Sequence, residues 1–175
     1  MDENDVEAFM GNTIENFDFS QHDLNCMRES FKRCDLLIHD GCLAALMKFE
    51  DVLYVYYFSV TEKHRGRGMQ FMRKIIQEYS PKIISLVTCH PAMVKISDRI
   101  AHEGRYRHTS DEKMVRMIVK KLEEDEGKIS MELRGTDVVL SNFYGGYIPQ
   151  RNRDFEFPEI LSEGDALLVI LEKEE

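Results

Sequence analysis

The feature that most constrains the fold is an apolar segment from Val52 to Val60, which reads Val-Leu-Tyr-Val-Tyr-Tyr-Phe-Ser-Val. Apolar side chains occupy both alternating sets of positions along it. Because a β-strand presents alternate side chains to opposite faces of a sheet, a strand of this composition must be buried on both faces. The segment therefore predicts a strand in the middle of a sheet whose two faces are covered.

The segments on either side of this strand predict an α/β fold with a mixed sheet. Apolar spacings of three and four over residues 5–33 are typical of one or two helices. Two short apolar strands then precede the central one, and the brief connections make all three antiparallel. The next strand should be parallel or nearly parallel to the central one, because a helical crossover joins them. The expected elements are strands at 36–38, 42–47, 52–60 and 82–88, helices at 69–79 and 91–102, and a hairpin formed by 105–109 and 113–119.

A charged run, Glu123-Glu124-Asp125-Glu126-Gly127, indicates a junction in the chain. We expect one domain over residues 1–122 and an acidic, β-rich extension over residues 123–175. Strand patterns in the extension fall at 128–133, 137–143 and 166–172. The extension either adds strands to the sheet or forms a small β appendage.

Composition limits the partners of the chain. Its 23 basic and 32 acidic residues give a net charge of −9, so its surface repels phosphate backbones and nucleic acid is not an expected partner. No window holds about 18 consecutive apolar residues, so no membrane-spanning helix is expected. The acidic start, Met1 to Asp5, differs from a secretory signal, and the four cysteines form no CxxC pair. We expect a cytoplasmic protein with no disulfide framework and no metal site.

The connection between the central strand and the next helix carries the clearest chemical signal. Arg65-Gly66-Arg67-Gly68 lies there, with Lys63 just before it. Glycine lets the backbone approach a ligand closely, and the first N–H groups of a helix have no intrahelical partners. Those amides and the positive helix end favour a pyrophosphate. A P-loop is excluded because no Lys-Ser or Lys-Thr follows, and a dinucleotide fingerprint is excluded because its third glycine is missing.

Residues 5–119 resemble the GNAT acyltransferase superfamily, in which a strand ending in valine leads into R-x-x-G-x-G/A at a helix start. The matching residues here are Val60 and Arg65 to Gln70. The resemblance implies a GNAT-like fold and an N-acetyltransferase that transfers the acetyl group of acetyl-CoA to a primary amine by direct attack. It implies that main-chain groups of Phe58 and Val60 bind the pantetheine arm. The thioester would lie between the strands at 52–60 and 83–88, and the pyrophosphate would bind the amides of Arg65, Gly66, Arg67, Gly68, Met69 and Gln70.

The chain departs from this family at two points. Gln70 replaces the small residue that ends the motif, and Ile100 stands four residues before Gly104, where the family often has an acidic tyrosine. His90 and Ser97 are candidate substitutes for that tyrosine, although His90 could equally cap the following helix.

A third catalytic candidate is Tyr56 on the central strand, where the family often carries a base. Core packing is the alternative for this side chain. Strict alternation along the strand would place Tyr56 on one face with Phe58, and Tyr57 on the other with Val55.

The sequence leaves more than one function open. The acidic surface favours a cationic acceptor, either a small-molecule amine or a Lys-bearing protein. The departures at Gln70 and Ile100 favour instead a degenerate GNAT fold that serves as a binding or structural accessory module, of the kind found in phage-like settings. A toxin that acetylates aminoacyl-tRNA is disfavoured by the net charge of −9.

Overall fold

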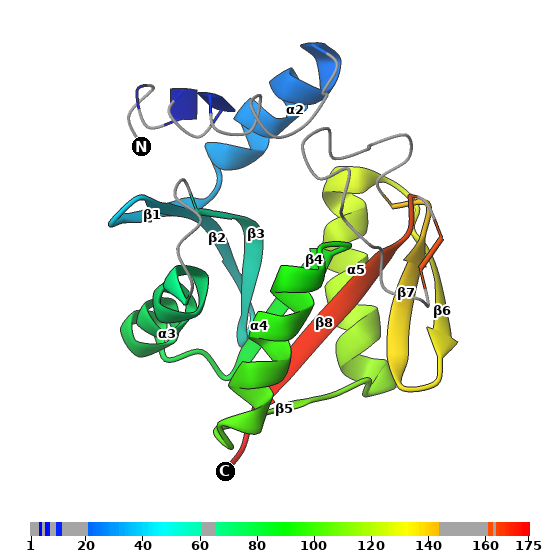
Figure 1. The fold of residues 1–175 in the computed structure, drawn as a ribbon. Helices are drawn as coiled ribbons and strands as arrows, with labels where there is room; N and C mark the ends of the chain where they lie inside the picture. The colour runs from blue at the N-terminus through cyan, green and yellow to red at the C-terminus, as the bar shows by residue number, and fades with distance from the viewer. Residues whose placement is uncertain are drawn as a thin grey trace. The chain divides into compact units, whose positions relative to one another are not determined.

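The computed structural model describes Asn4, Val6, Glu7, Met10, Gly11 and residues 21–60, 66–143, 161–162 and 164–175. These residues form two compact units, one ending at Lys82 and the other beginning at Ile83. Each unit combines β-strands with helices (Figure 1), so the predicted α/β class is confirmed. The parallel relation expected between the strands at 52–60 and 83–88 joins the two units and stays a prediction.

The first unit is an antiparallel three-stranded meander with a helix on each face. Two-residue turns connect its strands, and Asp40 and Gly41 both have positive φ, as the twist of a tight hairpin requires. Leu43 and Ala45 face the first helix, while Lys48 lies over the Tyr79 ring of the second. The elements are α2 (Gln21–Phe31), β1 (Asp35–His39), β2 (Cys42–Phe49), β3 (Val52–Val60) and α3 (Arg67–Tyr79).

A β-bulge interrupts the alternation of β3. Leu46 pairs with Val55 and Ala45 pairs with Tyr57, so Tyr56 is an extra residue without a counterpart on β2. The Tyr56 and Tyr57 rings both pack edge-on against Phe31 of α2, at centroid distances of 5.7 and 5.5 Å. The expected separation of these two tyrosines onto opposite faces is therefore wrong, because a bulge turns two successive side chains to the same side.

The second unit is an antiparallel sheet in the order β4-β8-β7-β6, and the short strand β5 also pairs with β8. Its buried middle strand, β8, comes from the acidic tail of the chain. β8 pairs with β4 from Ile83 to Thr88, so the tail adds strands to a sheet, which was the first of the two expected alternatives. The domain boundary at residues 122 and 123 stays a prediction. The elements are β4 (Ile83–Thr88), α4 (Pro91–His102), β5 (Tyr106–His108), α5 (Glu112–Glu126), β6 (Ser130–Arg134), β7 (Asp137–Ser141) and β8 (Ala166–Lys173).

The hairpin expected from 105–109 and 113–119 is wrong in its second half, which belongs to α5. Asp111 is the N-cap of this helix, and its carboxylate accepts a hydrogen bond of 3.1 Å from the Met114 N–H. The segment Ser110-Asp111-Glu112, expected as a turn, is therefore a helix start. The stripe that buries α5 follows the helical spacing of three and four and consists of Val115, Ile118, Val119 and Leu122.

None of the described helices is long and apolar enough to cross a membrane. Within the same described residues, no group of three or more His, Cys, Asp or Glu side chains is placed to hold a metal ion.

A buried carboxylate, Asp165, links two segments of the second unit. It is 8% exposed, and its oxygens accept hydrogen bonds from the Asn142 N–H at 2.9 Å and the Ser162 N–H at 3.2 Å. The Arg134 guanidinium lies 3.8 Å away. Asp165 therefore fixes the end of β7 to the chain entering β8.

Replacing Asp165 by Ala should lower the free energy of unfolding by about 2–4 kcal/mol, because two backbone N–H groups lose a charged acceptor. Urea unfolding measures this change. Asp137→Ala, at an exposed position at the start of β7, is the matched control and should change stability by less than about 0.5 kcal/mol. Equal losses in the two variants would contradict the linking role of Asp165.

Candidate cofactor-binding site

The register between β2 and β3 determines which main-chain groups of β3 point away from β2. Phe49 and Val52 flank a two-residue turn and are partners, so they form a hydrogen-bonded pair. Hydrogen-bonded and non-hydrogen-bonded pairs alternate from that point along an antiparallel ladder. Tyr54 therefore directs its N–H and C=O toward β2, and Val55 directs them away.

The bulge at Tyr56 shifts this alternation by one residue. Tyr57, opposite Ala45, forms the next hydrogen-bonded pair, so Phe58 and Val60 occupy non-hydrogen-bonded positions. Their N–H and C=O groups thus point away from β2. Without the extra residue, these same N–H and C=O groups would form hydrogen bonds with β2. The bulge therefore directs outward the main-chain groups of the two residues that the sequence predicts to bind pantetheine.

The start of α3 lies in the same unit as these groups. Gly66 is its N-cap in the left-handed region, at φ 84°, and its carbonyl accepts the first helical bond from the Gln70 N–H at 2.9 Å. The amides of Arg67, Gly68 and Met69 precede that bond. No described side chain caps this end, and the first turn contains no acidic residue. The helix dipole and the amides of a helix start favour an anionic group.

The motif residues have different surroundings in the structure. Arg65 lies outside the described residues. Met69 is buried, whereas Gln70 is exposed and its amide is engaged in the helix. The first turn of α3, which precedes the hydrogen bond of Gln70, contains the amides of Arg67, Gly68 and Met69 beside the left-handed Gly66.

Asp40, a residue for which the sequence indicates no role in binding, contributes a negative charge near the start of α3. The Arg67 guanidinium lies 3.9 Å from the carboxylate of Asp40, in the β1–β2 turn. Burial raises the pKa of the neighbouring Cys42 thiol, Arg67 lowers it and Asp40 raises it. Asp40 was recognisable only as a turn residue, because its contact with Arg67 depends on how the hairpin packs beside α3.

His90 caps α4 in the second unit. Its Nδ1 accepts a hydrogen bond from the Ala92 N–H at 3.1 Å, and its own backbone N–H donates to the Thr88 hydroxyl at 2.9 Å. In the neutral ring the proton is therefore on Nε2, and Nδ1 is not available as a base. The geometry matches the capping alternative for this residue.

Ser97 and Tyr56 are also engaged by their own units. Ser97 is 2% exposed, and its hydroxyl donates to the Met93 carbonyl at 2.9 Å. Tyr56 packs on Phe31. Ile100, where the family often has tyrosine, is 3% exposed and part of the core. The contacts of all three catalytic candidates are those of packing and capping.

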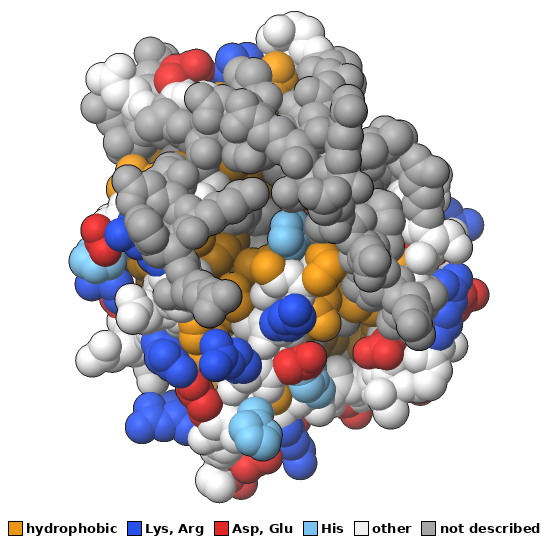
Figure 2. Space-filling view, in the orientation of Figure 1, with side chains coloured by type: hydrophobic (Ala, Val, Ile, Leu, Met, Phe, Trp, Pro, Cys, Tyr) orange, Lys and Arg blue, Asp and Glu red, His pale blue; other side chains and the backbone are white. Residues whose placement is uncertain are grey.

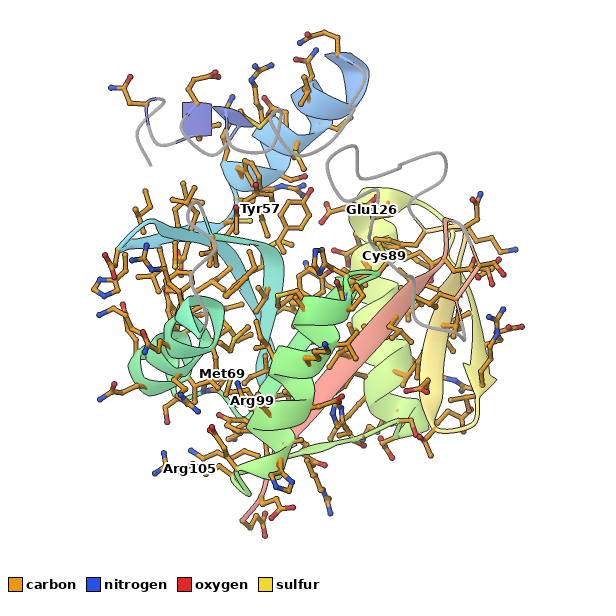
Figure 3. All side chains as sticks on the ribbon, in the orientation of Figure 1. Tyr57, Met69, Cys89, Arg99, Arg105 and Glu126 are labelled. Carbon is orange, nitrogen blue, oxygen red and sulfur yellow. The ribbon has the colours of Figure 1, made fainter. Side chains whose placement is uncertain are left out.

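Cys89 follows β4, and no sequence pattern around it indicates a special role. Its side chain packs against a buried cluster of Val139, Leu161 and Leu167. Burial raises the pKa of its thiol, and a hydrogen bond with its own backbone lowers it by less. A thiol of raised pKa is protonated at neutral pH and is a poor nucleophile. Figure 3 shows Cys89 beyond the end of β4, and Tyr57 on the side of β3 that faces α2.

Comparisons with known proteins include a distant likeness in fold. No protein-family model matches the chain, and no curated protein matches it in sequence. A crystal structure of a Bacillus subtilis acetyltransferase in complex with CoA is similar in fold, with 12% sequence identity and a TM-score of 0.46. The similarity covers 89% of this chain and 86% of that one. A likeness this distant leaves function to be inferred from the site itself.

Gly66→Ala should cost about 1–2 kcal/mol of stability, because an L-residue is strained in the left-handed region. A Cβ at this position would meet no atom within 4 Å, so the cost is conformational and not steric. Gly68, which lies inside the first turn of α3, is not among the residues with positive φ. Gly68→Ala is therefore the matched control and should stabilise by up to about 1 kcal/mol. Urea unfolding of both variants checks the opposite signs.

His90→Ala should lower stability by about 0.5–2 kcal/mol through loss of the helix cap, whereas His90→Asn should retain most of the stability. Thermal unfolding compares the two variants. His90→Asn should also keep any acyl-transfer activity, measured as release of free CoA thiol. An inactive His90→Asn variant with an unchanged melting temperature would show that the imidazole takes part in the chemistry.

Proposed function

We propose that the chain is a GNAT-type N-acetyltransferase that binds acetyl-CoA and transfers its acetyl group to a primary amine. One observation carries the proposal. The outward main-chain groups of Phe58 and Val60 occur in the same compact unit as the uncapped start of α3. These two features suit two parts of CoA, the extended pantetheine arm and the anionic pyrophosphate.

The pantetheine arm contains two amide groups in an extended chain, so it can add to a strand as a peptide does. Phe58 and Val60 supply alternate donors and acceptors for this purpose. The pyrophosphate is an anion and suits the amides of Arg67, Gly68 and Met69. Arg67 adds a positive charge at this point of an acidic protein.

In the proposed reaction the amine nitrogen attacks the thioester carbonyl, the C–N bond forms and the C–S bond breaks. The CoA thiolate leaves and takes up a proton, and the amine loses one. Because His90, Ser97 and Tyr56 are occupied in capping and packing, catalysis would depend on positioning and on stabilising the oxyanion. The acceptor we infer is a cationic small molecule or a Lys-bearing protein, in the cytoplasm.

The occupied candidates also favour a second function, a GNAT-fold module that binds CoA without catalysis. Ser97 donates inside its own helix, and Ile100 has no proton to give. The two functions share the cofactor site and differ only in turnover.

The melting temperature with and without acetyl-CoA tests the cofactor site directly. Ligand at 100 times its Kd stabilises the folded state by about 2.7 kcal/mol, which shifts the melting temperature by several degrees. Release of free CoA thiol with a panel of amines then tests turnover. No shift at millimolar acetyl-CoA contradicts both functions, and a shift without thiol release leaves the binding module.

Gly68→Glu should separate binding from stability. A carboxylate in the first turn of α3 stabilises the helix through its dipole by about 0.3–1 kcal/mol, and it repels the pyrophosphate. We expect an equal or higher melting temperature without ligand, and loss of the acetyl-CoA shift. Gly68→Gln has the same size without the charge and should retain part of the shift. An unchanged shift in Gly68→Glu would contradict the proposed phosphate position.

A further inference from the structure

The outer strand of the second unit, β6, has one side without a partner among the described strands. Figure 1 shows it at the end of its sheet, where it pairs with β7. An edge strand presents N–H and C=O groups that can pair with another chain. Which groups of β6 lie on that edge follows from its hairpin with β7.

Gly135 and Thr136 form a two-residue turn, so Arg134 and Asp137 are a hydrogen-bonded pair. Because hydrogen-bonded pairs alternate along the ladder, the backbone N–H and C=O groups of Glu132 also point toward β7. Met131 and Leu133 direct their N–H and C=O groups to the outer edge. This edge is therefore a short ladder with two residues ready to pair.

The side chains of the same two residues are apolar and exposed. Met131 is 43% exposed and Leu133 is 64% exposed, and only one other large apolar side chain of the described residues is as accessible. Exposed apolar residues on a strand edge are a feature that proteins usually avoid unless the edge is covered.

The polar face of β6 carries opposite charges two residues apart. Glu132 and Arg134 form an ion pair with each other, and Arg134 also lies near Asp165. Basic and acidic side chains lie next to one another on the side of the molecule where β6 runs (Figure 2). A strand with one charge of each sign at this spacing is complementary to an antiparallel copy of itself.

We propose that β6 is a homodimer interface, in which a second copy pairs antiparallel along the outer edge with Leu133 opposite the partner's Leu133. This register places Glu132 opposite the partner's Arg134, and the two-fold axis repeats the pair. Opposite charges in directly opposed positions stabilise a sheet, and like charges destabilise it.

The neighbouring registers are disfavoured by charge. Centring the axis on Glu132 places two glutamates opposite each other. Centring it on Met131 places Arg134 opposite the partner's Lys128. Of these three registers, only the one centred on Leu133 pairs unlike charges, and it brings the two exposed leucines into contact. A peptide from another protein would not need this self-complementary order, so a second copy is the occupant that the charge pattern favours.

Cross-linking tests the register in a Cys26→Ser background, because Cys26 is the exposed native cysteine. In the proposed register, Leu133→Cys places two cysteines opposite each other, with their Cα atoms about 5.5 Å apart. Met131→Cys places them about 14 Å apart along the strand. A short bismaleimide should cross-link most of the Leu133→Cys protein at about 100 µM and little of the Met131→Cys protein. Equal cross-linking of both variants, or of Met131→Cys alone, overturns the proposed pairing.

Light scattering during size exclusion tests the dimer without cross-linking. The unmodified chain should show a mass that rises toward twice the monomer mass with concentration. Leu133→Lys places two ammonium groups on the axis and should weaken association at least tenfold, with an unchanged melting temperature of the monomer. Met131→Lys is the control at the edge of the interface and should weaken it less. A monomer at all concentrations, with or without acetyl-CoA, overturns the proposal and leaves the cofactor site untouched.

Discussion

The extra residue at Tyr56 is the constraint on which the first unit depends. It allows two successive aromatic rings to pack on Phe31, which anchors α2 to one face of the sheet. It then returns the strand to the opposite parity, so that Phe58 packs on Phe71 of α3 at a centroid distance of 5.3 Å. The same bulge directs the main-chain N–H and C=O groups of Phe58 and Val60 away from β2. One irregularity thus shapes the core contacts of β3 and sets the direction of its main-chain groups.

The start of α3 has no side-chain cap among the described residues. If α3 began with a Ser or Asp N-cap, that side chain would accept a hydrogen bond from an N–H group of the first turn. The N–H group would then not be available to an anion. Gly66 begins the helix by its φ value instead, and the described residues supply no side-chain acceptor in its place. The start of α3 therefore lacks the stability of a side-chain cap, and the helix is held by its buried side, which includes Met69, Met72 and Ile75.

The sequence predicted much of this because most of the signals are local. The apolar run to Val60, the glycines of the motif and Pro91 at the start of α4 define elements by short-range chemistry, and those elements formed as expected. The bulge could not be read in the same way, because it exists only in the pairing of Tyr56 and its neighbours with β2. The start of α5 was misread because Asp111 is equally suited to a turn and to a helix cap. Asp165 reaches Asn142 across 23 residues of sequence, a contact that no local pattern contains.

The candidate catalytic residues differ from the cofactor residues in a way that bears on mechanism. Main-chain groups of a strand point where its register directs them, whatever side chains they carry, so the outward direction of the Phe58 and Val60 groups follows from the pairing with β2. That the predicted cofactor residues bind CoA stays a prediction. An acid or base depends on a free side-chain atom, and the hydroxyl of Ser97 and Nδ1 of His90 each already have a partner within α4. A positional mechanism asks little of such groups, because a neutral amine close to a thioester needs no nucleophile from the protein. The proton balance would then depend on the acceptor itself, since only an amine that reaches the site uncharged can attack. In the proposed reaction, the identity of the acceptor, more than any side chain of the protein, would determine whether an acetyl group is transferred.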